Sequence, residues 1–168
     1  MKTKDLVEVS LLLAIGFVLH SLFPPILFGM KPDFSLAMLF AIILLKRDYK
    51  FGLLAGIATG VFTALTTGFP GGQVANIIDK LITSIVMSTL IIKFYKENIF
   101  FVGLINGIGT LLSGTIFLST AALLFRLPGP MLALILTVVI PAAVINIFTG
   151  ILLYKSIIES RKFLQQVG

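Results

Sequence analysis

A cation and an anion flank a proline in the stretch Gly29-Met30-Lys31-Pro32-Asp33, which lies between two apolar runs. Lys31 and Asp33 provide the two charges that a zwitterion such as an amino acid would need, because a buried zwitterion requires a partner for each of its charges. The same two residues are equally compatible with ordinary charges at the level of the lipid headgroups. The stretch therefore indicates either a binding loop for a small bipolar molecule or a turn at a membrane surface.

A second polar group lies further along the chain, at helical spacing within the apolar run over 73–94. Its members share one face of the predicted helix: Gln73, Asn76, Asp79, Lys80 and Thr83. Ionisable residues are costly in a transmembrane helix and indicate a functional site by default. Adjacent residues on a helix do not face each other, so we expect Asp79 and Lys80 each to meet a different partner. The alternatives are a structural ion pair with another helix or a side chain that reaches the membrane surface.

Other polar residues stand alone or in a stripe within apolar segments. His20 lies near the outer end of the first apolar run, and Asn146 lies in the last one. Asn106, Thr110 and Ser113 form a stripe between them. Polar side chains in apolar helices bind one another across helices as readily as they bind a ligand, so both roles remain open for these residues.

Catalytic motifs are not recognisable in the sequence. The chain has one histidine and no cysteine, which leaves few nucleophile–base pairs and excludes thiolate metal sites. It has no G-x-x-x-x-G-K-[ST] phosphate loop and no H-E-x-x-H metal motif, and no Gly-x-Ser-x-Gly elbow. We expect no enzymatic activity, no metal site and no cofactor, and an energy source supplied by other proteins.

The composition predicts an all-α integral membrane protein. Of the 168 residues, 58% are hydrophobic and 12% are charged, whereas a soluble domain is roughly half apolar and about a quarter charged. One compact transmembrane domain over residues 1–168 is the natural organisation at this length. Lipid is therefore an expected partner of the chain.

Six apolar segments should position the polar residues, over 6–28, 34–45, 51–68, 73–94, 99–125 and 131–154. The second is too short to cross a hydrocarbon core of about 30 Å and is predicted to be re-entrant or shielded by protein. The small residues of the third predict close packing against another helix. Pro141 is expected to kink the sixth, and residues 155–168 are expected to form a polar, basic tail.

The distribution of cations predicts the orientation. If the six segments alternate across the membrane, one side carries Lys2, Lys4, Lys46, Arg47, Lys50, Lys93, Lys96, Lys155, Arg161 and Lys162, and the other carries Lys31, Lys80 and Arg126. The cation-rich side is cytoplasmic, so both termini are inside and the polar candidates open outward. Topology thus explains the net charge of +6, and no nucleic-acid partner is expected.

Three stretches resemble the tryptophan transporter family, the predicted tryptophan-specific substrate-binding (S) components of energy-coupling-factor (ECF) transporters. They are Gly29-Met-Lys-Pro-Asp33 after a Pro-Pro pair, the turn Thr66-Thr67-Gly68-Phe69-Pro70-x-Gly72-Gln73, and Asn76-x-x-Asp79-Lys80. The resemblance covers essentially the whole chain. It implies the S-component fold of six transmembrane helices in the bacterial plasma membrane, with both termini cytoplasmic. It also implies a transmembrane coupling (T) subunit and two ABC ATPases as partners.

The resemblance further implies capture of L-tryptophan at the outer face, for ATP-driven uptake. Lys31 or Lys80 would meet its carboxylate, and Asp33 or Asp79 its ammonium group. Candidates to accept from the indole N–H are Asn76, Gln73 and Asn146, with His20 as a further contact, and the ring would pack on Phe23, Phe28, Met30 and Phe69. Many S components dock on the coupling subunit through an Ala-x-x-x-Ala pattern on the first helix. Here that pattern maps to Ser10 and Ala14, or to Ala14 and Val18, and neither pair is a full match.

Two other functions are compatible with the sequence. The chain could be an S component for another small molecule, such as a vitamin or an aromatic amine. It could also be a self-sufficient secondary transporter, which internal repeats would favour; the two halves of the sequence show no convincing similarity.

Overall fold

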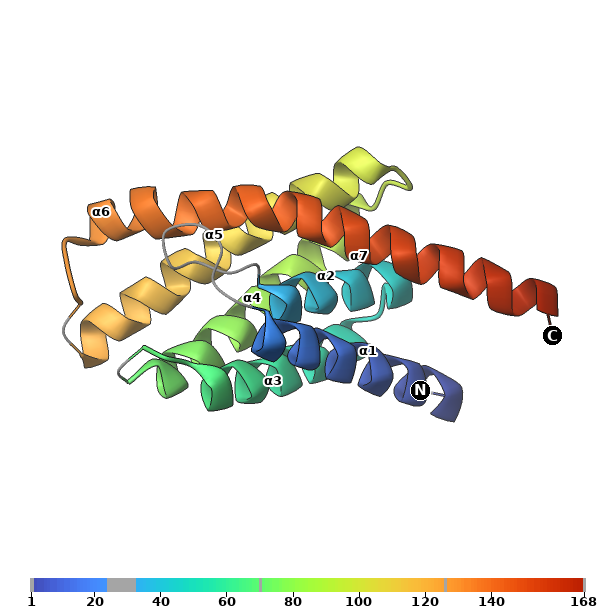
Figure 1. The fold of residues 1–168 in the computed structure, drawn as a ribbon, viewed down its shortest axis with the longest axis horizontal. Coiled ribbons are helices and arrows are strands. Elements are labelled where there is room, and N and C mark those ends of the chain that lie inside the picture. Colours follow the sequence, from blue (N-terminus) through green and yellow to red (C-terminus); the bar gives the residue numbers. More distant parts are fainter. Residues whose placement is uncertain (1, 24–32, 70, 126, 168) are drawn as a thin grey trace.

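The computed structural model describes residues 2–23, 33–69, 71–125 and 127–167. Every regular element within these residues is helical (Figure 1): α1 (Thr3–Leu22), α2 (Phe34–Lys46), α3 (Tyr49–Thr66), α4 (Gly72–Phe94), α5 (Ile99–Leu124), α6 (Met131–Leu134), the π-helical η1 (Ile135–Val139) and α7 (Ile140–Val167). The predicted all-α class is confirmed. The first helix starts earlier than expected, and the rest of its predicted range, 24–28, lies outside the described residues.

The short helix α2 is the centre of the bundle. It packs against α1, α3, α4, α5 and α7, and its residues from Phe34 to Leu44 are all buried. A helix that is apolar on every side must be enclosed, because it has no polar face for solvent. The prediction that this segment is shielded by protein is confirmed.

Helices α3 and α4 approach each other closely along a row of glycines. A Cβ atom added to Gly60 would lie 3.2 Å from the Ile77 Cα, and side chains at Gly52 and Gly56 would overlap Ser88 and Ser84. Small residues let helix backbones come together where lipid provides no hydrophobic driving force. The predicted close packing of the third segment is confirmed, and it holds α4 with its polar face toward the interior.

Four helical stretches are long and apolar enough to cross a membrane: Thr3–Leu22, Tyr49–Thr66, Ile99–Leu124 and Met131–Gln166. Helix α4 has 23 residues and is not among these four. Helix α2 has only 13 residues. The described helices are therefore those of a multi-pass membrane protein, and membrane crossing by α2 and α4 stays a prediction.

The last apolar segment contains a local change in helix type before Pro141. Proline has no N–H, and its ring clashes with the carbonyl group four residues earlier, here that of Thr137. Thr137 lies in η1, where the wider π-helical turn accommodates the proline. The polar, basic tail is helical, since α7 continues to Val167, and Ile157 within it packs against the core.

Charged residues connect the first and last helices near the end of the bundle where both chain termini lie (Figure 1). The Lys46 ammonium lies 2.5 Å from Asp5 and 2.7 Å from Glu8, and Arg161 forms an ion pair with the same Glu8. These contacts bring the start of α1, the end of α2 and the end of α7 together. At the opposite end of the same helices lies the polar site described next.

Candidate substrate-binding site

A cavity of about 480 Å³ opens among the helix ends farthest from the chain termini. Asp33, His20 and Thr63 line it from the start of α2 and the ends of α1 and α3, and Asn76 and Lys80 line it from α4. The volume is within the roughly 300–1,000 Å³ typical of small-molecule sites. The structure therefore brings Asp33, from the end of loop one, together with Asn76, Asp79 and Lys80 of the fourth segment.

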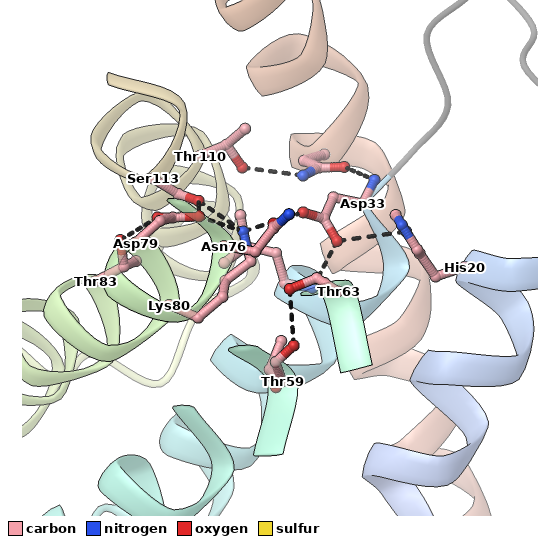
Figure 2. A network of polar contacts seen from close by, with 12 residues as sticks. His20, Asp33, Thr59, Thr63, Asn76, Asp79, Lys80, Thr83, Thr110 and Ser113 are labelled. Atoms are coloured by element: carbon pink, nitrogen blue, oxygen red, sulfur yellow. Dashed lines mark hydrogen bonds and ion pairs between the residues drawn. The ribbon is translucent and has the colours of Figure 1, made fainter. Parts of the chain in front are cut away.

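Lys80 is the polar centre of the cavity (Figure 2). Its ammonium donates to Asp79 Oδ2 at 2.6 Å and to Ser113 Oγ at 3.0 Å, and it lies 3.5 Å from Asp33 Oδ2. Lys80 is only 3% exposed, and a buried charge is strongly unfavourable without partners. Three oxygens from three helices compensate for the water that the ammonium has lost.

Asp79 is fully buried and is bonded from several directions. Its Oδ2 accepts from Lys80 and from the Ser113 hydroxyl at 2.8 Å, and its Oδ1 accepts from Thr83 at 3.0 Å. Asp79 and Lys80 each meet other partners, as expected. They also bond to each other, which was not expected, because the flexible lysine side chain bends toward the neighbouring carboxylate. Both oxygens of the Asp79 carboxylate are thus bonded to neighbouring side chains, one of which is Lys80.

Asp33 carries the more open of the two carboxylates. Its side chain is 24% exposed, against 1% for Asp79. It is the N-cap of α2, with Oδ1 accepting from the Leu36 N–H at 3.0 Å, as short polar residues do at helix starts. The same oxygen lies 3.5 Å from His20 Nδ1. The cap thus places a carboxylate at the cavity wall, opposite the Lys80 ammonium.

The three amides predicted to accept from an indole N–H differ in position. Asn76 lines the cavity, and its Nδ2 donates to the Gly72 carbonyl at 2.9 Å. Because a carbonyl oxygen only accepts, the amide nitrogen must face Gly72, and among the described residues nothing donates to the Asn76 Oδ1. Gln73 is exposed and Asn146 is buried behind the wall; the structure brings neither to the cavity.

The remainder of the wall is apolar and partly aromatic. Phe69 and Phe117 line it as an edge-to-face pair, with ring centroids 5.4 Å apart. The position of Phe69 agrees with its prediction as a contact residue. Phe117 was not predicted, since nothing in the pattern of 15 phenylalanines distinguishes it. Phe23 packs on Phe34 instead of lining the cavity.

The stripe on α5 contributes to the site through two of its three members. Ser113 and Thr110 line the cavity, whereas Asn106 donates to the Val102 carbonyl within its own helix. The spacing of the stripe was the signal that could have identified Ser113 as a partner of Lys80.

Several predicted residues lie elsewhere. Lys31, Phe28 and Met30 fall outside the described residues, so their predicted contacts stay predictions. Ser10, Ala14 and Val18 are exposed along one side of α1, away from the cavity. Their proposed role in docking also stays a prediction.

The described helices and this cavity define a multi-pass membrane protein with a solute-sized polar site. The family described as "Tryptophan transporter TrpP" matches residues 2–162. The chain belongs to the tryptophan transporter family.

Similar proteins support this assignment over nearly the full length. A probable tryptophan transport protein of Bacillus subtilis is 44% identical, covering 98% of each chain. One of Clostridium acetobutylicum is 42% identical, covering 96% of each chain. One of Clostridium perfringens is 38% identical, covering 94% of this chain and 93% of the other. No solved structure matches the chain.

Proposed function

We propose that this chain is the S component of an ECF-type importer, a single transmembrane domain that captures L-tryptophan at the outer face for ATP-driven uptake. Family membership and the names of three relatives support tryptophan as the transported molecule. The observation that carries the proposal is the pair of opposite charges, Asp33 and Lys80, 3.5 Å apart in one cavity. Such a pair offers a partner to each end of an amino-acid zwitterion.

In the proposed complex the substrate separates the Asp33–Lys80 pair. The substrate ammonium binds the Asp33 carboxylate, and the substrate carboxylate binds the Lys80 ammonium. Both charges of the zwitterion are then compensated inside the protein, which burial requires. Asp79 and Ser113 keep the Lys80 ammonium in place during this exchange.

The indole ring of the substrate fits the other half of the cavity. Phe69 and Phe117 offer aromatic faces and edges, with which a further aromatic ring packs favourably. The Asn76 Oδ1 supplies an acceptor for the indole N–H. A hydrogen-bond acceptor of this kind disfavours analogues without the N–H, because the acceptor would then stay unpaired in the complex.

Energy coupling is assigned to partner proteins: a T subunit and two ABC ATPases. The chain carries no phosphate-binding loop of the G-x-x-x-x-G-K-[ST] type, in keeping with a transport role that needs an external ATPase. Ser10, Ala14 and Val18 on the exposed side of α1 are the proposed docking contacts for the T subunit. Cation-rich helix ends near both termini support the proposed cytoplasmic position of those termini in a bacterial plasma membrane.

Reconstitution tests the proposed function. Purified chain in vesicles should take up labelled tryptophan only with the coupling subunit, both ATPases and ATP. Uptake by the chain alone, driven by an ion gradient, would contradict the S-component role and support a secondary transporter. Purified chain without tryptophan binding, but with binding of a vitamin or an aromatic amine, would contradict the substrate assignment.

A further inference from the structure

Asn146 joins three helices directly behind the cavity. Its Oδ1 accepts from the backbone N–H of Asp33 at 2.9 Å, and its Nδ2 donates to the Thr110 Oγ1 at 3.0 Å. Figure 2 shows how close Thr110 and Asp33 lie to the rest of the polar network. Asn146 is 1% exposed, so its amide is fully enclosed by α7, α5 and the start of α2.

The chemistry of the two partners determines the orientation of this amide. A backbone N–H only donates, so the Asn146 oxygen must face Asp33. The nitrogen then faces Thr110, whose hydroxyl oxygen accepts. Both ends of the amide are therefore used within the protein, and Asn146 contributes to the site through its neighbours.

Asp33 depends on this contact because it lies at a helix terminus. Its side chain caps α2 by accepting from Leu36, while its own N–H lies outside the helical hydrogen-bond pattern. Asn146 supplies the partner for that N–H. The Asn146 bond holds the backbone of Asp33 and the Leu36 bond holds its side chain, which lies 3.5 Å from Lys80.

We infer that Asn146 is a positioning residue for recognition of the substrate ammonium group. It holds the first residue of α2 against α5 and α7, so that the Asp33 carboxylate stays at the cavity wall. Without it, the Asp33 N–H loses its partner and the carboxylate loses its defined position, whereas Lys80 keeps its bonds to Asp79 and Ser113. This inference rests on the proposed function, because it assumes a ligand with an ammonium group.

Three indole ligands separate a positioning role from a general structural one. L-Tryptophan has both charges, tryptamine has only the amine, and indole-3-propionate has only the carboxylate. In Asn146→Ala, the affinities for tryptophan and tryptamine should each fall about tenfold, the scale of one hydrogen bond to a charged group. The affinity for indole-3-propionate should change less than about twofold. Equal losses for all three ligands, or no loss, would overturn the inference.

A double-mutant cycle tests whether the effect passes through Asp33. In an Asp33→Asn background, Asn146→Ala should no longer alter the ratio of tryptophan to indole-3-propionate affinity, because residues that act through one contact are not additive. A further change of about tenfold in that ratio in this background would show that Asn146 acts elsewhere.

Two more variants keep the test decisive. Asn106→Ala removes another fully buried amide, one that does not line the cavity, and should leave all three affinities unchanged even if it lowers stability. If Asn146→Ala fails to fold, Thr110→Val removes the acceptor of the Asn146 Nδ2 at nearly constant volume and should give the same ligand discrimination with smaller loss. An unmodified protein that binds none of the three ligands would refute the proposed function itself, independently of Asn146.

Discussion

Lys80→Met tests the assignment of the substrate carboxylate most directly. The change removes the ammonium but keeps a long apolar side chain in the same buried space. In the unmodified protein the ammonium is held by Asp79 and Ser113 and faces Asp33 from 3.5 Å. It is therefore already positioned for an incoming carboxylate, and its loss should be felt by ligands that carry one.

The expected magnitude follows from the contact that is lost. A buried hydrogen bond to a charged group is worth about 1.5–3 kcal/mol, which corresponds to an affinity loss of about 10- to 150-fold for tryptophan. Tryptamine has no carboxylate, so its affinity should not fall. It should rise, because the carboxylates of Asp33 and Asp79 stay in the site without the Lys80 ammonium and attract the amine. The two ligands should thus respond in opposite directions.

The assay uses the absence of tryptophan from the chain. With excitation selective for indole, all emission comes from the ligand, and bound and free ligand are distinguished by their spectra. Lys93→Met is a matched control, since it makes the same change on the same helix at an exposed position and should leave both affinities unaltered. A folded Lys80→Met protein that loses tryptophan and tryptamine equally, or neither, would refute the assignment.

Three further predictions concern the rest of the chain. Asp79→Asn should lower the free energy of unfolding by about 1.5–3 kcal/mol, because Lys80 loses its closest charged partner but keeps Asp33. It should also weaken tryptophan binding about tenfold or more, because the ammonium then turns to Asp33; unchanged affinity in a folded protein would argue against this prediction. Ala14→Leu should prevent co-purification with the T subunit, because a larger side chain keeps helices apart. Tryptophan binding should stay normal, and intact assembly would show that α1 is not part of the docking face. Glu8→Gln should lower the free energy of unfolding by about 0.2–1 kcal/mol, measured by thermal unfolding, and this loss should be smaller at high salt. A loss that does not depend on salt would show that the ion pairs with Lys46 and Arg161 are not its cause.

Hydropathy and periodicity were enough to predict the helical framework. Apolar segments placed α2 through α5 within about two residues of their observed ends, because helix formation in lipid depends on local composition. The polar face of α4 was predicted for the same reason, since helical spacing alone brings Asn76, Lys80 and Thr83 to one side. The predicted last segment ended before the observed end of α7, because the polar residues of the tail do not indicate that Ile157 packs against the core.

The partners of the polar residues were decided by tertiary structure. Asp33 and Asn146 are separated by 113 positions in the chain, and no local pattern specifies which helices meet there. Spacing likewise could not show that Gln73 is exposed, that Asp79 and Lys80 bond to each other, or that Phe117 joins the wall. The sequence by itself determined which residues are polar in an apolar helix, since that depends only on their order. Only the packing of six segments decided which of them share a cavity, because each contact joins residues that are distant along the chain and close in space.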